Sequence, residues 1–528
     1  MKTSASDPGS IFDILGPVMT GPSSSHTAGA VRIGLIGRYI SGGEPMEVDI
    51  TFYGSLSQTY KGHLTDSGVV AGLLGMDVDD PRIKSAYAEA ERRGLQVRIH
   101  PLESKEKNPN TIDLEITTRE GKTRIESITV GGGEILVSSV DGNPTELRGK
   151  REMLLVFLGE DFDRNRDLQD LSLSEAWGGD GGDVLAIPLD EAARAGMTEK
   201  LQNTTGVRKT RLLAPLYDYG TAEGRPLFRT VDEMLGAVSS SGTRLPQVIE
   251  EYEQGRSSLG KDGIREKLSR VWAVMEEAAR QGISGENDMI GGLMPGNDAK
   301  RLVAAMGSGR TLSGAVLPLA LARALGAMEV NASMGRVCAA PTAGSCGVLP
   351  GVLSAVAEIY QTSKESLVDG LLVAGVYGAL IAAKAPVSGA LGGCQSEIGV
   401  ASAMAASALV QIGGGSAEET SQAMALALKN LLGLVCDPVA GPVEVPCIKR
   451  NAVGVANAFA AADMALAGIK SVIPPDEVID ALRNVQSLLP VELRGTMLGG
   501  LGSTETARRL KGEWLAKCSG CQGECGGK

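Results

Sequence analysis

Aromatic side chains are scarce in this sequence: they make up 3% of its 528 residues, whereas glycine contributes 70. A core with so few rings must be built from small side chains, which let helices and loops approach one another closely. We therefore expect tightly packed helices around a site. The apolar share of 43% and the charged share of 22% are typical of a soluble globular protein. The length predicts roughly two to four domains.

Neither a basic surface nor an export signal is predicted. The net charge of −12 argues against broad nucleic-acid binding. Asp7 and Asp13 interrupt any apolar stretch at the N-terminus, so no secretory signal is predicted. The longest uncharged run, residues 398–417, is rich in Ala, Ser and Gly, which favours a buried helix over a membrane span. We expect a cytoplasmic protein without nucleic-acid or membrane partners, whose thiols stay reduced.

Histidine and cysteine are distributed unevenly. The three histidines, His26, His63 and His100, lie in the first hundred residues, and no cysteine precedes Cys338. The eight cysteines are Cys338, Cys346, Cys394, Cys436, Cys447, Cys518, Cys521 and Cys525. If both residue types serve one site, that site lies between two domains.

The N-terminal part of the chain reads as mixed α/β. Residues 46–54 and 110–118 alternate apolar and polar side chains, as half-buried strands do. Residues 66–76 and 81–94 have helical spacing, and Gly94 is expected to end the second helix. These patterns predict an α/β domain over residues 1–150.

The pattern changes twice further along the chain. Residues 151–222 suggest strands with one helix between them, interrupted by the Gly- and Asp-rich segment 177–183. A small regulatory domain and an elaborate linker both fit this region. Residues 223–528 have helical spacing, many alanines, and glycine-rich turns that carry the cysteines. The fold class predicted is therefore an α+β multidomain protein with an all-helical C-terminal domain.

A run of hydroxyl side chains precedes the apolar stretch at residues 21–34, "GPSSSHTAGAVRIG". Such a run is typical of a capped helix start, because hydroxyls accept hydrogen bonds from the first backbone N–H groups. The same groups can instead bind a carboxylate. Three consecutive serines and a histidine exceed the needs of one cap, which favours a binding loop. Its candidate residues are Ser23, Ser24, Ser25, His26 and Thr27.

His63 and the turn at residues 340–351 each permit two interpretations. A lone histidine is more often a satisfied polar residue than a catalyst, although its pKa suits general-base work near neutrality. The turn contains Thr342, Gly344 and Ser345 and is about as consistent with a tight helix connection as with an anion cradle. The turn lacks the Gly-Lys-Ser/Thr sequence that ends a phosphate-binding loop. His100 and Cys346 are expected to be structural.

Cys394, Cys436 and Cys447 each lie in a turn flanked by Gly or Pro. Their spacing is neither that of a zinc knuckle nor that of a ferredoxin, so it is weak evidence for a metal. Cys436 and Cys447 allow a disulfide, two metal ligands or two unrelated buried thiols, of which the disulfide is the weakest in a reducing compartment. The tail cysteines Cys518 and Cys521 have zinc-like C-x2-C spacing but need partners from elsewhere.

Several of these segments, in order, resemble the iron–sulfur-dependent L-serine dehydratases, also called L-serine ammonia-lyases. Residues 21–34 and 60–66 resemble the β portion of that family. Residues 331–353, 392–406 and 433–452 resemble the α portion. The resemblance covers nearly the whole chain and implies β and α portions fused in one polypeptide, in some relatives with an ACT-type regulatory domain between them. Residues 151–222 stand in that place and are ACT-like at best.

The resemblance implies a [4Fe–4S] cluster held by Cys394, Cys436 and Cys447, with one iron that lacks a protein thiolate and can bind substrate. A cysteine near the C-terminus occupies that iron in some resting relatives. The candidates for this role are Cys518, Cys521 and Cys525.

The implied reaction is β-elimination of L-serine to pyruvate and ammonia, a step of amino-acid degradation and gluconeogenesis. His63 is the implied base, and the serine run with His26 and Thr27 would hold the carboxylate. L-Cysteine or L-threonine is an alternative substrate, since a pocket discriminates one methyl group by only about 1–3 kcal/mol. A non-catalytic iron–sulfur or zinc sensor is the alternative of a different class. The expected partners are an amino acid and further copies of the same chain.

Overall fold

The chain divides into two compact units, and one of them is formed by two separate stretches of the chain. The computed structural model describes residues 7–104, 106–108, 110–162, 183–189, 194–221 and 224–520. One unit is Ser25–Thr221, and the other joins Met1–Ser24 to Ala222–Lys528. The first 24 residues thus belong with the helical part of the chain. The domain boundaries predicted after residues 150 and 222 stay predictions.

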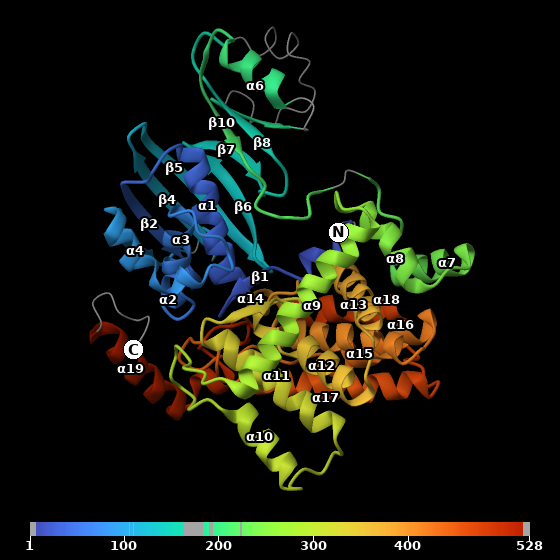
Figure 1. The fold of residues 1–528 in the computed structure, drawn as a ribbon. Helices are drawn as coiled ribbons and strands as arrows, with labels where there is room; N and C mark the ends of the chain where they lie inside the picture. Colours follow the sequence, from blue (N-terminus) through green and yellow to red (C-terminus); the bar gives the residue numbers. More distant parts are fainter. Residues whose placement is uncertain are drawn as a thin grey trace. The chain divides into compact units, whose positions relative to one another are not determined.

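A six-stranded sheet forms the centre of the unit Ser25–Thr221, with strand order β3-β2-β4-β5-β6-β7 (Figure 1). The first pair, β2 and β3, is parallel, and the other neighbours are antiparallel. The strands predicted at 46–54 and 110–118 are confirmed as β2 and β4. The bounds are β2 Glu47–Tyr53, β3 Gln96–Leu102, β4 Thr111–Thr118, β5 Gly121–Gly131, β6 Glu134–Val140 and β7 Asn143–Leu147.

Two helices, α1 (Gly29–Ser41) and α3 (Thr65–Leu73), pack closely against each other in this unit. A Cβ added to Gly34 would clash with the backbone of α3, and one added to Gly72 would clash with the backbone of α1. The close approach of helices that the glycine content predicted is therefore present between α1 and α3. The shorter elements are α2 Ser55–Thr59, η3 Pro81–Ser85 and α4 Ala86–Arg93. Gly94 ends α4 in the left-handed region with φ of 75°, as predicted.

A second, three-stranded antiparallel sheet in the same unit has the order β10-β8-β9. Its elements are β8 Met153–Leu158, β9 Val184–Pro188, α6 Arg194–Gln202 and β10 Val207–Leu213. Leu154, Val156, Leu185 and Leu201 form its small buried core. The strands and helix predicted between 151 and 222 are present, while most of the Gly- and Asp-rich segment lies outside the described residues. Effector binding by this region stays a prediction.

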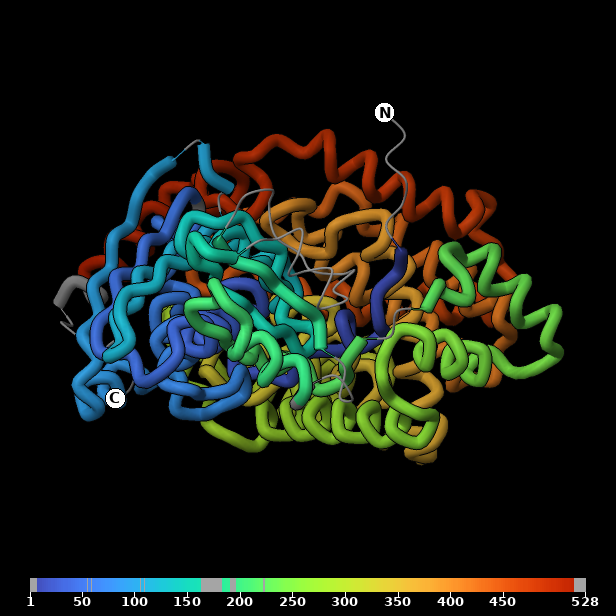
Figure 2. The backbone as a smooth tube through the Cα atoms, turned by 90° about the horizontal axis from the view of Figure 1, so that it is seen from above, coloured from blue at the N-terminus to red at the C-terminus, as the bar shows by residue number. Residues whose placement is uncertain are grey.

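The other unit is built from helices, as predicted for the C-terminal part of the chain. In Figure 1 it carries the colours from green to red, and Figure 2 shows the same helices along the tube. The helices are α7 Val231–Ser241, α8 Leu245–Gln254, α9 Lys261–Ser284, α10 Asp298–Gly307, α11 Val316–Ala332, α12 Val348–Tyr360, α13 Lys364–Lys384, α14 Gly389–Gly392, α15 Val400–Ile412, α16 Ala417–Asn430, α17 Cys447–Leu466, α18 Pro475–Leu488 and α19 Glu505–Gly520.

Small residues bring these helices together. Gly282 on α9 and Gly326 on α11 face each other so closely that a Cβ on Gly282 would clash with the backbone of Gly326. Every residue from Val400 to Val410 of α15 is buried, which confirms the buried helix predicted within 398–417. Among the described residues, Ala343–Tyr360 and Lys364–Lys384 are long and apolar enough to cross a membrane, and in their 18-residue apolar windows 72% and 83% of the residues, respectively, are buried inside the protein.

The N-terminal segment is held within the helical unit by a strand pair and a buried carboxylate. Strand β1 (Val18–Thr20) pairs antiparallel with β11 (Arg336–Cys338). At η1 (Ile11–Asp13), the Ser10 hydroxyl and the Ile11 N–H donate to Glu253 at 2.6 and 2.9 Å. The sequence patterns predicted neither contact, because both join residues far apart in the chain.

Glu253 predicts a pH dependence for this attachment. Burial raises the pKa of Glu253 from 4.5 to about 7. Between pH 4.5 and about 7, Glu253 holds a proton when the N-terminal segment is attached and releases it when the segment detaches. The free energy of detachment is therefore full below pH 4.5 and declines as the pH rises to about 7. This free energy should fall by up to about 3 kcal/mol in total, at about 1.4 kcal/mol per pH unit. Amide exchange of Ile11, expressed as an opening free energy, measures it.

The matched variant is Glu253→Gln, whose amide side chain does not titrate. We expect its Ile11 opening free energy to be flat over the same pH range. If the Ile11 opening free energy had the same slope against pH in the wild type and in Glu253→Gln, Glu253 would not be the cause of the pH dependence.

Candidate metal centre and active site

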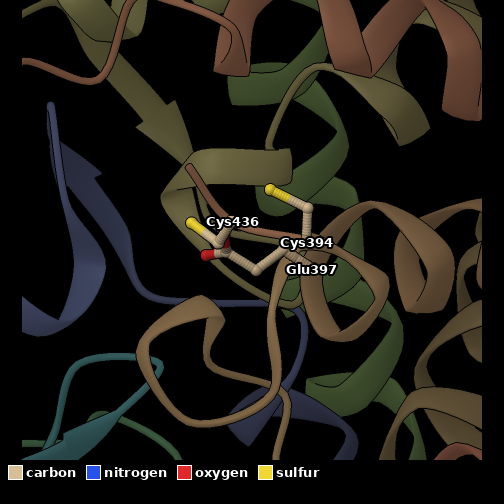
Figure 3. Close-up of side chains that lie close together, drawn as sticks. All are labelled: Cys394, Glu397 and Cys436. Atoms are coloured by element: carbon tan, nitrogen blue, oxygen red, sulfur yellow. The ribbon is translucent and has the colours of Figure 1, made fainter. Parts of the chain in front are cut away.

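Three side chains of types that can bind a metal lie close together in the helical unit (Figure 3). The sulfurs of Cys394 and Cys436 and a carboxylate oxygen of Glu397 lie within 4.8 Å of one another. Both cysteines are buried. Cys394, Cys436 and Cys447 are all free thiols, so the disulfide between Cys436 and Cys447 is excluded in this structure.

Glycines give the two sulfurs and the carboxylate room to meet. Cys394 directly precedes a π-helical turn, η5 (Gln395–Gly399), which continues into α15. A Cβ on Gly389 would clash with the Glu397 carboxylate and lie 3.5 Å from the Cys436 sulfur. Gly393 adopts φ of 80°, a conformation that side chains rarely allow. Small residues are therefore required at these turns for steric reasons.

A segment near the C-terminus holds the backbone of Cys436. The Cys436 N–H donates to the Leu493 carbonyl at 2.9 Å, and the Gly495 N–H donates to the Cys436 carbonyl at 2.7 Å. Leu493 ends the short turn η6 (Val491–Leu493). The direction of the Cys436 side chain thus depends on residues more than fifty positions away, which the sequence patterns did not indicate.

Cys447 is the first residue of α17 and is half-buried. Burial, followed by the effects of Cys394 and Glu397, raises the pKa of its thiol. The contact with the Cys394 thiol, followed by burial, raises the pKa of Cys436. These thiols resist deprotonation together, because a buried thiolate is disfavoured beside another. A bound metal reverses this preference, since its charge stabilises thiolates. The donor set fits a thiolate-bound metal group.

Arg450 is a functional candidate that the sequence patterns missed. Its Nη1 lies 3.5 Å from the Cys394 sulfur and donates to the Val435 carbonyl at 2.8 Å. The same nitrogen is 2.8 Å from a carboxylate oxygen of the buried Asp437. Arg450 follows Cys447 by three positions on α17, so helical spacing could have indicated that the two share a face. A hydrogen bond from an arginine to a metal-binding sulfur tunes and stabilises such a site.

The turn predicted to contact substrate adjoins the cysteines. The Thr342 hydroxyl donates to Glu397 at 2.7 Å. The Asn451 amide donates to the carbonyls of Gly344 and Cys447 at 2.9 and 3.0 Å, and thereby joins the turn to the start of α17. The Ser345 hydroxyl donates to the Ala340 carbonyl at 3.0 Å and holds the turn together. Glu397 and Asn451 are further residues of this site that sequence reasoning did not identify.

Glu397 is half-buried among these groups. Burial raises the pKa of its carboxyl, and the Thr342 hydroxyl partly offsets this effect. A Cβ on Gly344 would lie 3.0 Å from the same carboxylate, so glycine leaves the space that Glu397 occupies.

The serine run divides between the two units at Ser24 and Ser25. In the helical unit, the Ser24 hydroxyl accepts a hydrogen bond from the Ala343 N–H at 3.2 Å, in the middle of the 342–345 turn. Ser24 is buried, and Ser23 and Ser25 are half-buried. Ser24 therefore lies beside the turn that sequence analysis had singled out independently.

The segment that follows is a π-helical turn, η2 (Ser24–Ala28), which leads into α1. The α1 helix is preceded by Ala28, and no side chain caps it there. Such turns are rare and often occur at functional sites.

Two of the histidines meet in the unit Ser25–Thr221. The Nδ1 atoms of His26 and His63 are 2.7 Å apart, and the rings stack with centroids 4.7 Å apart. The Thr27 hydroxyl donates to the His63 carbonyl at 2.7 Å. Burial lowers the pKa of His26 to about 4, against a smaller opposing effect of a hydrogen bond with Asn110. His63 is half-buried.

The remaining predicted residues lie elsewhere or beyond the described range. His100 is exposed and pairs with Asp49 at 2.9 Å. Cys346 is buried with its sulfur 3.6 Å from the Met328 sulfur, in line with a structural role. Cys518 is part of helix α19, whereas Cys521 and Cys525 fall outside the described residues. The role of a tail cysteine stays a prediction.

Comparison with known families first defines the class of protein. The family model of the serine dehydratase alpha chain matches residues 231–502, and that of the serine dehydratase beta chain matches residues 10–139. Both parts of a serine dehydratase are thus present in one polypeptide.

Individual relatives agree with this class over most of the chain. The L-serine dehydratase of Haemophilus influenzae is 31% identical over 93% of this chain and 98% of its own length. The L-serine dehydratase TdcG of Escherichia coli is 30% identical over the same shares. A probable L-serine dehydratase alpha chain of Bacillus subtilis is 46% identical over 54% of this chain and 94% of its own length. The chain belongs to the L-serine dehydratase family, with β and α portions fused, as the sequence resemblance predicted.

Proposed function

We propose that this protein converts L-serine to pyruvate and ammonia by β-elimination. The observation that carries the proposal is the cluster of Cys394, Cys436 and Glu397, whose sulfurs and carboxylate oxygen lie within 4.8 Å of one another, beside the turn at Thr342. Family membership over nearly the whole chain supports the same conclusion.

Cys394, Cys436 and Cys447 would hold a [4Fe–4S] cluster. The burial of Cys394 and Cys436 and the raised thiol pKa values of Cys436 and Cys447 fit a site that is completed by a cationic group. When bound, a cluster with one iron lacking a thiolate supplies Lewis acidity toward the serine hydroxyl, which is otherwise a poor leaving group. Arg450 would stabilise the Cys394 thiolate through its hydrogen bond to that sulfur.

The substrate carboxylate is assigned to the serine run and the 342–345 turn. Since the Ser24 oxygen accepts from the Ala343 N–H, its own proton remains to be donated to an anion. Ser23 and Ser25 add hydroxyls nearby in the sequence, whereas the Thr27 hydroxyl donates to the His63 carbonyl, and Gly344 keeps the turn open. Positioning the carboxylate in this way would orient the Cα–H bond toward the base.

His63 is the proposed base that removes the Cα proton. Its position is constrained by the contact with His26 and by the Thr27 hydrogen bond to its carbonyl. Leu64, the next residue, has φ of 51°, an uncommon conformation for leucine that marks a constrained backbone at this point. Elimination yields an aminoacrylate, which hydrolyses to pyruvate and ammonia.

Anaerobic reconstitution followed by an assay tests the function. We expect protein loaded with iron and sulfide to release pyruvate from L-serine faster than from L-cysteine and faster than 2-oxobutyrate from L-threonine. Faster turnover of cysteine or threonine would reassign the substrate. Cluster-loaded protein that turns over none of the three, and whose cluster spectrum ignores L-serine, would favour a non-catalytic sensor instead.

A further inference from the structure

Gln395 connects the two chain segments that carry Cys394 and Cys436. It directly follows Cys394 in the sequence, and it is fully buried. Its backbone N–H donates to the carbonyl of Leu434, two positions before Cys436, at 2.9 Å. The two cysteines are far apart in the sequence, yet the residue after the first is bonded directly to the segment that leads to the second.

The side-chain amide of Gln395 adds one hydrogen bond to each segment. Its Oε1 accepts the Gly433 N–H at 2.9 Å, and its Nε2 donates to the Gly392 carbonyl at 2.9 Å. Both partners are backbone groups, and an N–H can only donate whereas a carbonyl can only accept. These partners therefore determine which end of the amide is oxygen and which is nitrogen. The amide spans from the turn before Cys394 to the turn before Cys436.

The other contacts of the two cysteines are of a different kind. Cys394 and Cys436 belong to a small apolar cluster, which also contains Ile398, Leu431 and Leu434. Apolar contact is not directional, whereas a hydrogen bond forms only within a narrow range of distance and angle. Packing in this cluster therefore brings the two segments together, and the bonds of Gln395 fix their register.

We propose that Gln395 is a positioning residue of the metal centre, whose side-chain amide holds the Cys394 and Cys436 sulfurs at the separation at which both bind one metal group. The two sulfurs lie within 4.8 Å of each other. The inference rests on the proposed function only in that these cysteines are metal ligands, and it requires no turnover. Residues that orient metal ligands contribute about 10–100-fold to metal affinity.

Cadmium binding to the full-length protein before cluster loading measures this contribution. Cd²⁺ is a soft cation that favours thiolates, and its bonds to sulfur absorb in the ultraviolet. Replacing Cys518, Cys521 and Cys525 by serine in every sample removes the competing thiols of the tail. In this background, Cys436→Ser should abolish the signal of the site. Gln395→Met, which removes the amide but keeps a side chain of similar length, should weaken Cd²⁺ binding about 10–100-fold.

Gln422→Met is the matched control. Gln422 lies on α16 in the same unit, and its Oε1 accepts the Ser471 N–H at 2.8 Å while its Nε2 donates to Glu418 at 3.0 Å. Its replacement should leave Cd²⁺ affinity unchanged. A residue that supports only the fold lowers the free energy of unfolding without changing the affinity of the folded protein. Lost stability with full affinity in Gln395→Met, or an equal loss of affinity in Gln422→Met, would overturn the proposal.

Cluster loss after anaerobic reconstitution provides the second readout. A chelator should remove iron from Gln395→Met about 10-fold faster than from the wild type, and from Gln422→Met at the wild-type rate. Equal rates in Gln395→Met and the wild type would overturn the proposal. Failure of the proposed function is distinguishable, because wild-type protein that binds metal through Cys394 and Cys436 without turning over L-serine would refute the reaction and leave the role of Gln395 intact.

Discussion

Replacing Cys436 by serine should remove the proposed iron–sulfur cluster and, with it, the proposed turnover of L-serine. The Cys436 sulfur is buried beside Cys394 and Glu397, and its backbone is held by Leu493 and Gly495. A hydroxyl in this place is a poor ligand for an iron–sulfur cluster, which thiolates hold. Altering residues that merely support a metal ligand weakens binding about 10–100-fold, so the loss of a ligand should cost at least this much. Iron and sulfide analysis after anaerobic reconstitution measures the effect.

Cys338→Ser is the control for this variant. Cys338 is also a buried thiol of the helical unit, and burial raises its pKa to about 12. It lies in β11 rather than among the cluster cysteines, so its replacement should leave iron and sulfide content unchanged. Full cluster content in Cys436→Ser would show that the ligand assignment is wrong.

Replacing His63 by alanine should abolish measurable turnover while leaving the cluster intact. A positioned general base typically contributes about 10²–10⁴-fold to the rate, and this chain has only three histidines. His63 belongs to the unit Ser25–Thr221, whereas Cys394, Cys436 and Cys447 belong to the other unit, so the cluster should load normally. The measurement is kcat for L-serine together with the absorption spectrum of the cluster.

His100→Ala is the comparison for His63→Ala, because His100 is exposed and pairs with Asp49 on the neighbouring strand. Its kcat and cluster spectrum should match the wild type. Activity in His63→Ala close to that of the wild type would make His63 a structural residue. Loss of the cluster together with activity would mean that this histidine supports the metal site rather than the proton transfer.

The elements that sequence analysis predicted correctly are those with a local pattern. The alternation of apolar and polar side chains at 46–54 was sufficient to predict strand β2, because every second side chain of that strand is buried. The run of small, uncharged residues within 398–417 was sufficient to predict a buried helix, which is α15. Likewise, glycine at position 94 ended α4 in the left-handed region. In each case the physical cause acts within a few residues.

The candidate site was only partly predictable, for the opposite reason. Family resemblance singled out Cys394, Cys436 and Cys447, and the structure brings the first two together with Glu397. Glu397 itself depends on a hydrogen bond from Thr342, 55 positions earlier in the chain. No local pattern reports a partner at that distance.

By itself, the sequence determined the fold class, the family and the residue types of the site, because these follow from local periodicity and from motifs in order. Only the tertiary structure decided which residues meet. It paired β1 with β11, assigned the first 24 residues to the helical unit, and directed His26 at His63. The physical reason is that hydrogen bonds and burial act between atoms in space. Their partners are chosen by the packing of whole helices and strands.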